Sequence, residues 1–507
     1  MRTQEKKDLL QSGDDICQKK LSGSLSKNLD RLRLLFRDDA TFMIRSFSSR
    51  SAHPIRFSIV YLDGMSDLFI MHQLIKSLMR SDLTEDMPRR ELITVIPQCH
   101  ISDPGVHQIM LVGDVLKALL KGDLVLFVDY LDHAFVVPTN GYRKRDISES
   151  LTETPINGPK ESFIEDLESN LTMVRRKITS SHLKFVPMTV GTITRTKIYI
   201  SYMDNLVRKD IVEEVKERLN RVDIDGILDS GYIQELIRDH PYSIFEMINS
   251  SEKPDSCAAE ILEGRVAIFV DGSPFVLTVP YILAEMTQAS EDYYLNFFFA
   301  SFNRFLRTIG IFGSILIPAV YLSITSYHLE ILPYPILISI AQSMEGIPFP
   351  AWLNLFMTLL IFDIIREAIT RMMPHISESM SFVGTLVLGN ILIESRIICA
   401  PVVIIAGLSG ILTLLNMSMS STIIVMRYTL LLGAAFFGIY GTALLFSLSV
   451  LHLVSLRSFS VPYFMNLSRF DDHNSQDIWI RAPWRLMKLR PKIFGSRNPK
   501  RQATSDI

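Results

Sequence analysis

Cysteine pairs and catalytic motifs are what this chain of 507 residues has least of. Its four cysteines, Cys17, Cys99, Cys257 and Cys399, lie far apart with no CxxC or Cys/His ligand spacing, so neither a zinc site nor a disulfide framework is predicted. The sequence also has no P-loop, GxGxxG, HExxH or GxSxG motif. We therefore expect no catalytic residues, no metal ligands and no cofactor.

Charged side chains are also scarce between Arg307 and His452. Thr308–Ser326 is a run of 19 residues without a charge. A helix of this length, rising about 1.5 Å per residue, spans a hydrocarbon core of roughly 30 Å. The preceding segment, Asp292–Arg307, is rich in Phe and Tyr and suits an interfacial helix that enters from the cytoplasm. The N-terminus has no apolar segment and is not a secretory signal. The sequence thus predicts a large soluble N-terminal region followed by transmembrane helices.

Four membrane crossings are predicted, near residues 308–327, 350–366, 395–416 and 428–456, and six crossings are the alternative. Ile331–Ile340 and Ser379–Ile393 are then short partial helices. Between Arg481 and Arg501 the tail carries eight Lys/Arg and no Asp or Glu. After apolar spans this favours a cytoplasmic tail over a nucleic-acid arm, and the net charge of −2 makes no case for nucleic acid. An even number of crossings puts both ends on the cytoplasmic side.

A few charged residues interrupt the apolar region. Asp363 and Arg366 lie three positions apart on one helix face, where they can form an ion pair, and Glu367 shares the face of Asp363. Glu394 and Arg396 break an otherwise apolar stretch of about 35 residues. Such charges are costly in lipid, so they mark either helix ends and ion pairs within the protein or a water-filled path. The first interpretation is favoured, and the second stays open.

The soluble region contains an internal repeat. The two copies are RFSIVYLDG (56–64) with LLKGDLVLFVDYLDHAFVVP (119–138), and KIYISYMDN (197–205) with ILEGRVAIFVDGSPFVLTVP (261–280). Each copy predicts a strand, a turn, an amphipathic helix and a glycine-led hairpin of two strands. The expected fold class is therefore an α/β soluble region of two related subdomains followed by an all-α transmembrane helical bundle.

Composition sets the expected domain boundaries. They are a polar N-terminal tail at 1–28, a first α/β subdomain at 29–145, a linker at 146–165, a second α/β subdomain at 166–290, a transmembrane helical region at 291–460 and a basic cytoplasmic tail at 461–507. The linker is polar and contains proline and glycine, which is typical of a connection between folded parts.

Ordered motifs over some 430 residues resemble one family. They are EGIPFPAW (345–352), IREA (365–368), SLRSFSVPY (455–463), NGPKESFIEDLESNLTMVRRKI (157–178) and LEGRVAIFVDGSPF (262–275). Together they resemble the A subunit of bacterial spore germinant receptors, the GerA family. The chain departs from the family pattern at Asp363, where Glu is usual, at Ser395–Arg396, where small residues are usual, and at Ser460, where Gly is usual.

The resemblance implies a multi-pass protein of the inner membrane of a dormant spore. Its expected partners are a transporter-like germinant receptor B subunit, a lipoprotein C subunit, further copies of this chain and membrane lipid. It also implies that copies of the chain surround a pore that releases monovalent cations when a nutrient binds to the complex. The sequence does not name the nutrient.

The leading hypothesis is therefore a non-enzymatic A subunit of a nutrient germinant receptor, acting in spore germination as an oligomeric ligand-gated channel. Candidate pore or gating residues are the charged groups of the apolar region: Glu345, Asp363, Arg366, Glu367, Glu394 and Arg396. One alternative is a secondary transporter, which the proline-interrupted segment 332–350 would suit. The other is a membrane-anchored scaffold of the same complex.

Overall fold

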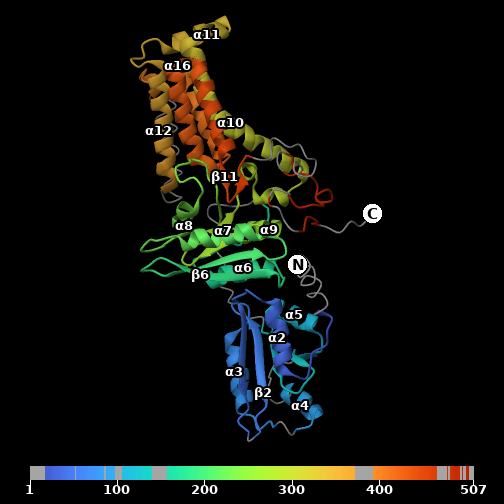
Figure 1. Cartoon of the computed structure of the whole chain (residues 1–507). Coiled ribbons are helices and arrows are strands. Elements are labelled where there is room, and N and C mark those ends of the chain that lie inside the picture. The colour runs from blue at the N-terminus through green and yellow to red at the C-terminus, as the bar shows by residue number, and fades with distance from the viewer. Residues whose placement is uncertain are drawn as a thin grey trace. The chain divides into compact units, whose positions relative to one another are not determined.

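The structure is a computed structural model of the chain. It describes residues 17–51, 53–84, 87–97, 105–139, 157–371, 392–464, 477, 480–491, 494 and 498–501. The chain divides into two compact units, which can be followed in Figure 1. The α/β unit comprises Met1–Arg238, Ile248–Pro280 and Leu489–Ala503, and the helical unit comprises Asp239–Met247, Tyr281–Lys488 and Thr504–Ile507. The expected tail at 1–28, the linker at 146–165 and the partial helix at Ser379–Ile393 lie largely outside the described residues.

The first half of the α/β unit is a five-stranded antiparallel sheet with helices on both faces. Its strands are β1 (Phe42–Ser48), β2 (Arg56–Leu62), β3 (His107–Ile109), β4 (Leu124–Val128) and β5 (Ala134–Val137), in the order β1-β2-β4-β5-β3. Helices α2 (Leu25–Leu35) and α5 (Val112–Lys121) pack on one face, and α3 (Leu68–Met79) and α4 (Arg89–Val95) pack on the other. Because side chains alternate along a strand, β4 supplies both cores and all its residues are buried.

The second half repeats this layout. Its strands are β6 (Leu183–Val190), β7 (Thr196–Met203), β8 (Asn249–Ser251), β9 (Val266–Val270) and β10 (Val276–Val279), in the order β6-β7-β9-β10-β8. Its helices are α6 (Leu167–Lys177), α7 (Lys209–Asn220), α8 (Ser230–Ile237) and α9 (Pro254–Glu263). Both α5 and α9 end at a glycine in the left-handed conformation, Gly122 and Gly264, directly before a buried strand. The repeat predicted from the sequence is confirmed as two related α/β subdomains.

A buried ion pair joins the two subdomains. Arg175 of α6 donates from Nη2 to Asp39 Oδ2 at 2.5 Å and to Thr41 Oγ1 at 3.0 Å. Lys184 of β6 donates to the Leu35 carbonyl at 3.0 Å, and burial lowers the pKa of its ammonium group. The subdomains therefore share a polar interface from which water is largely excluded.

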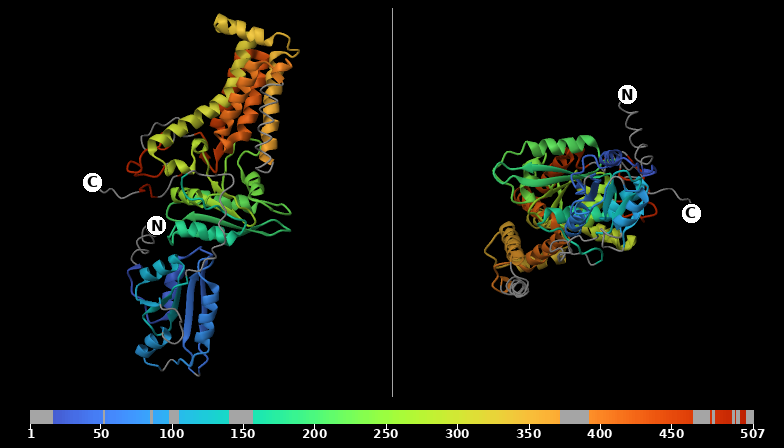
Figure 2. Two further views of the ribbon diagram at one scale, coloured as in Figure 1. Left: turned by 180° about the vertical axis from the view of Figure 1, so that it is seen from behind. Right: turned by 90° about the horizontal axis from the view of Figure 1, so that it is seen from below.

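The helical unit packs its long helices side by side, as Figures 1 and 2 show. In chain order it contains η2 (Leu283–Thr287), η3 (Ser290–Tyr293), α10 (Phe297–Tyr327), η4 (Leu329–Ile331), α11 (Tyr334–Met344), α12 (Ala351–Arg371), α14 (Leu392–Glu394), α15 (Ala400–Leu414), η6 (Met417–Met419), α16 (Ser420–Ser455), β11 (Arg457–Ser458) and β12 (Val461–Pro462). Its core is apolar, and Ala319, Leu355, Ala406 and Leu430 are fully buried there. Small side chains such as alanine let neighbouring helices approach closely.

The chain reverses direction inside α16. Gly438 has φ +60° and ψ −139°, which no helix contains. A Cβ added to Gly441 would collide with the Gly433 carbonyl oxygen. In one straight helix, residues eight positions apart lie about 12 Å from each other. α16 is therefore a hairpin of two arms on either side of Gly438, where the sequence predicted a single crossing near 428–456. The apolar run is continuous through the turn, so periodicity could not reveal it.

Among the described residues, two helical segments are long and apolar enough to cross a membrane, judged by length and composition. They are Phe297–Tyr327, where a window of 18 residues has mean hydropathy 1.8, and Met417–Ser455, which contains the reversal at Gly438 and where such a window has mean hydropathy 1.9. The first begins before the crossing expected near 308–327, because the aromatic segment ahead of it continues the same helix. α12 and α15 overlap the crossings expected near 350–366 and 395–416. The number of crossings stays a prediction.

Candidate functional site

The first charged cluster of the helical unit joins three helices. Arg427 of α16 donates from Nη2 to Asp363 Oδ2 of α12 at 2.6 Å and from Nη1 to Ser409 Oγ of α15 at 3.1 Å. Tyr428 donates its hydroxyl to the same Asp363 oxygen at 2.7 Å. These four residues, Asp363, Ser409, Arg427 and Tyr428, are the Asp363–Arg427 cluster.

Helical periodicity brings these polar groups to the buried face of each helix. Each follows a buried apolar residue by three or four positions: Leu359 precedes Asp363, Ala406 precedes Ser409 and Ile423 precedes Arg427. The cluster is thus surrounded by apolar side chains of the bundle core. The local pattern that builds the core also carries the charges into it.

Because the cluster is buried, the packing of these helices depends on the ion pair. The Arg427 side chain is 1% exposed and the Asp363 side chain is 18% exposed. Removing one partner of a buried ion pair typically costs roughly 3–5 kcal/mol, because the other charge is left without compensation. The Arg427 Nε atom is buried and has no hydrogen-bond partner among the described residues. Any movement of α12 against α16 must therefore exchange or break strong, charge-assisted hydrogen bonds.

Of the predicted site residues, Asp363 belongs to this cluster, but its partner differs from the expected one. The sequence allowed a pair with Arg366 on the same helix, whereas Asp363 pairs with Arg427 on another helix. Arg427 does not stand out in the sequence, because it lies between two long apolar runs, Ile397–Met426 and Tyr428–Leu451, where a charge is expected. The available signal was that a lone arginine between such runs cannot avoid the bundle.

The remaining predicted residues lie elsewhere on the helical unit. Glu367 forms an exposed ion pair of 2.7 Å with Arg371, and Arg366 is half-buried on the same helix. Glu345, Glu394 and Arg396 are exposed. Arg396 Nη1 lies 3.0 Å from the place that a Cβ on Gly346, the residue after Glu345, would occupy. Three of the six residues therefore lie on α12, and Arg396 lies beside Gly346, which follows Glu345 at the end of α11.

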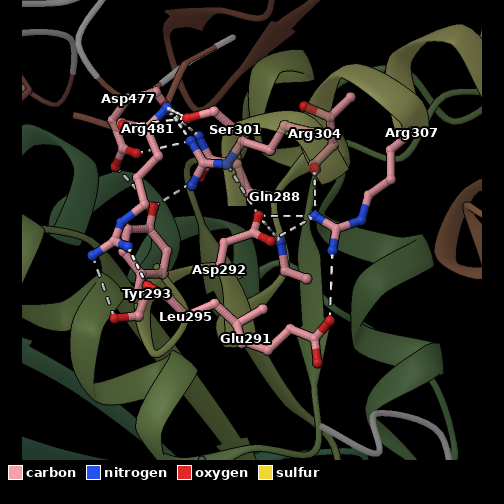
Figure 3. Close-up of polar contacts among 12 residues, drawn as sticks. Gln288, Glu291, Asp292, Tyr293, Leu295, Ser301, Arg304, Arg307, Asp477 and Arg481 are labelled. Carbon is pink, nitrogen blue, oxygen red and sulfur yellow. Dashed lines mark hydrogen bonds and ion pairs between the residues drawn. The ribbon is translucent and has the colours of Figure 1, made fainter. Parts of the chain in front are cut away.

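The second charged cluster lies where α10 begins (Figure 3). Arg304 donates from Nε to Asp292 Oδ2 at 3.0 Å, and from Nη1 to Asp477 Oδ1 at 2.8 Å and to the Asp477 carbonyl at 2.7 Å. Arg307 donates from Nη1 to Asp292 Oδ1 at 2.9 Å. The side chains of Arg304 and Asp292 are completely buried. Asp292, Arg304, Arg307 and Asp477 form the Arg304 network.

The C-terminal segment is bonded to this network. Tyr293 donates its hydroxyl to Asp477 Oδ2 at 2.8 Å, and Gln288 donates from Nε2 to the Asp477 carbonyl at 2.6 Å. Arg481 donates from Nη1 to the Leu295 carbonyl at 2.8 Å. The sequence placed Arg304 in an interfacial helix but gave no sign of these partners, because a pairing over such a distance leaves no local pattern.

Both clusters connect segments of the helical unit and hold them together. Each matches carboxylates with guanidinium groups and adds hydroxyl or carbonyl partners, which fixes segments by charge-assisted hydrogen bonds. Among the residues that the structure describes, no group of three or more His, Cys, Asp or Glu could hold a metal ion. The arrangement can hold the helices and the bonded segments in one packing.

Two related α/β subdomains, followed by apolar helices of which two segments are long enough to cross a membrane, are the architecture of a membrane-associated protein with a large folded N-terminal region. The family model described as Bacillus/Clostridium GerA spore germination protein matches residues 30–493. The chain belongs to this family, as its motifs predicted.

Several known proteins are similar to this chain. The membrane protein YfkQ of Bacillus subtilis is 34% identical over 98% of this chain and 97% of its own length. Spore germination protein KA of Bacillus subtilis is 32% identical over 95% of this chain and 89% of its own length. The crystal structure of the N-terminal domain of the A subunit of the Bacillus megaterium spore germinant receptor GerK3 has 30% sequence identity and a TM-score of 0.43. That match covers 52% of this chain and 98% of the solved one.

Proposed function

We propose that the chain is the A subunit of a nutrient germinant receptor complex that triggers spore germination, and that its helical unit forms an oligomeric ligand-gated channel releasing monovalent cations. The proposal places the chain in the inner spore membrane with both ends on the spore-core side. Its partners there are a transporter-like B subunit and a lipoprotein C subunit. No catalytic step is assigned to the chain. Membership of the GerA family supports the proposal.

The observation that carries the channel proposal is the Asp363–Arg427 cluster. A buried arginine among apolar helices is costly, and such residues pair with one another or line the paths of ions and protons. In one state of the bundle Arg427 neutralises Asp363. In another, with α12 and α16 shifted, the Asp363 carboxylate becomes available to attract a cation and water. On this proposal, the cluster is the element with two arrangements that gating requires.

Nutrient binding to a partner subunit would act by shifting the population of these two arrangements. Moving a complex from mostly closed to mostly open takes about 5.5 kcal/mol of differential affinity. In an oligomer this energy is shared among the subunits, so each Asp363–Arg427 pair has to contribute only part of it.

Spores carrying Asp363→Asn or Arg427→Gln test the proposal. Potassium release after addition of a mixture of amino acids and sugars should change several-fold in either variant, because each leaves the other buried group unpaired. The double variant should be less affected than the sum of the single changes, since the two residues interact directly. The control is Glu330→Gln, which removes an exposed carboxylate of the helical unit that is not among the six candidate residues. Wild-type release from both test variants, at normal protein levels, removes the cluster from the mechanism.

A secondary transporter is the second candidate. The reversal at Gly438 favours it, because transporters use interrupted helices. Reconstituted complexes separate the two functions. A channel passes many ions per opening, whereas a transporter moves its solute in a fixed ratio per cycle. Ion flux from complexes whose A subunit lacks the α/β unit would argue against the third candidate, a membrane-anchored scaffold.

A further inference from the structure

The first half of α10 has two faces of opposite character. Phe298, Phe299, Phe302, Phe305 and Phe312 are each exposed, although they are large and apolar. At about 100° per residue, they fall within a sector of roughly 140° around the helix axis. The opposite face carries the buried Arg304 network. Soluble proteins rarely expose a continuous apolar patch of this kind, so the aromatic face needs an occupant.

A segment from the C-terminal tail lies along the edge of this face. The Arg481 backbone N–H donates to Ser301 Oγ at 3.1 Å, and Ser301 lies one helical turn before Phe305. Arg481 and Met487 are buried and hold the segment in place. The side chains exposed on it are apolar or basic: Ile480, Trp484, Arg485, Leu486 and Lys488.

We propose that the aromatic face of α10 and the segment Ile480–Lys488 form one interfacial platform, which binds the headgroup region of an anionic bilayer leaflet. Continuity is the first reason. The aromatic half of α10 continues without a break into the part that is apolar enough to cross a membrane. Aromatic side chains concentrate where such a helix meets the headgroups. The occupant of the face is therefore the lipid that surrounds the rest of the helix.

Charge is the second reason. The arginines on the opposite face of α10 are neutralised within the protein by Asp292 and Asp477. The exposed charges along the edge of the platform, Arg485 and Lys488, are both positive. Two copies of the platform facing each other would repel, whereas anionic headgroups attract basic residues near the surface. A lipid surface fits this combination better than a second copy of the chain.

The Arg304 network gives the platform its geometry. It fixes the rotation of α10, so the aromatic face cannot turn inward, and through Asp477 it keeps the tail segment beside that face. Along the helix axis, Phe298 and Phe312 are separated by 14 residues, or about 21 Å. The platform thus predicts a gradient of depth from the headgroups toward the bilayer interior.

Site-specific fluorescence in the full chain tests the platform. Cys17 and Cys99 are replaced by serine, the buried Cys257 and Cys399 are kept, and a nitrobenzoxadiazole probe is attached at Phe298→Cys, Phe302→Cys, Phe312→Cys or Leu486→Cys. The matched control is Phe69→Cys, an exposed phenylalanine on α3 of the α/β unit. The protein is placed in nanodiscs of phosphatidylglycerol or phosphatidylcholine that contain lipids with nitroxides at the headgroup or along the acyl chain.

The expected result is at least threefold stronger lipid quenching at 302, 312 and 486 than at 69. The probe at residue 298 should be quenched more by headgroup nitroxides, and the probe at residue 312 should be quenched more by acyl-chain nitroxides. Quenching at 486 should fall in zwitterionic discs, and Asp477→Asn should reduce it while 302 stays quenched. If the probes at residues 302 and 486 are quenched no more strongly than the probe at residue 69, the proposal is overturned. Efficient crosslinking of 302 to 302 between copies, without lipid quenching, overturns it in favour of a protein contact.

Discussion

Arg304 and Asp477 lie 173 residues apart in the chain and form an ion pair of 2.8 Å. The pair makes part of the C-terminal segment a component of the helical unit rather than an appendage to it. The region beyond residue 460 was expected to be a basic cytoplasmic tail, and Asp477 is an acidic residue that serves as the point of attachment. The Asp477 carboxylate is therefore one of the groups that tie the C-terminal segment to the start of α10, together with Arg481.

Neutralising this carboxylate should loosen the segment. Asp477→Asn keeps the shape of the side chain but loses a charge-assisted hydrogen bond, which is worth roughly 1–3 kcal/mol. Each 1.4 kcal/mol corresponds to about a tenfold change in an opening equilibrium, so trypsin should cut after Arg481 and Arg485 about tenfold faster or more. Glu367→Gln, which removes an exposed pair, should leave cleavage unchanged. Unaltered cleavage of the Asp477 variant would show that the backbone contact from Gln288 suffices.

The last part of the tail should bind the α/β unit on its own. Arg490 donates from Nε to the Leu262 carbonyl at 2.9 Å, Arg501 pairs with Glu263 at 2.6 Å, and the buried Phe494 ring lies 4.3 Å from the Arg265 guanidinium carbon. A fragment of residues 17–282 should therefore be stabilised by a peptide of residues 489–501. At 100 times its Kd, such a ligand adds about 2.7 kcal/mol, seen as a rise in Tm.

The control for this experiment is the same peptide with Phe494→Ala, which keeps the charges but removes the buried ring. It should raise the Tm much less. Equal effects of the two peptides would mean that binding is purely electrostatic, and the packing of Phe494 would then have no part in it.

The α/β fold could be predicted because the sequence patterns that specify it are local. The repeated strand, helix and hairpin patterns each span a few residues, and the glycines that end α5 and α9 recur at equivalent positions. Gly at such positions is explained by the left-handed backbone they require. A related case is the two-residue turn between β11 and β12. There Ser460 has φ +65°, which accounts for the glycine usual in the family.

The charged clusters could not be predicted in the same way. Arg427 and Asp363 are 64 residues apart, and nothing in the sequence around either residue specifies the other. Apolar periodicity locates helices but says little about which helices touch. The sequence therefore indicates that a charge at Asp363 is costly among apolar helices. Its partner can be identified only from the packing of α12 against α16.

The α/β unit should lose stability as pH rises, in part because of Glu260 on α9. Burial raises the pKa of the Glu260 carboxyl above its ordinary value of 4.5, although the nearby Arg265 guanidinium acts in the opposite direction. The folded state then binds a proton more tightly than the unfolded state. This contribution is fully present below pH 4.5 and is lost as pH rises through the raised folded-state pKa.

Urea unfolding of the 17–282 fragment between pH 4 and pH 8 measures this effect. Glu260→Gln cannot ionise, so its stability should fall less steeply with pH than that of the wild type. The control is Glu213→Gln, at an exposed position on α7, which should keep the wild-type slope. A Glu260 variant with the same slope as the wild type would assign the pH dependence to other groups.

Gly438 should tolerate no side chain, because its backbone lies in a region open almost only to glycine. An added Cβ would sit 3.0 Å from the Tyr327 ring, whose hydroxyl donates to the Ala435 carbonyl at 2.6 Å at the same turn. Gly438→Ala should therefore lower stability by about 1–3 kcal/mol and reduce the Tm of the detergent-solubilised protein.

Gly410 on α15 is the matched control, since a Cβ there would meet no heavy atom within 4 Å. Alanine is the better helix former by about 1 kcal/mol, so Gly410→Ala should keep or raise the Tm. If Gly438→Ala instead raised the Tm as Gly410→Ala does, residue 438 would have to lie in a continuous helix. The two arms of α16 would then be one straight segment of 36 residues, and the antiparallel contact of Gly433 with Gly441 could not exist.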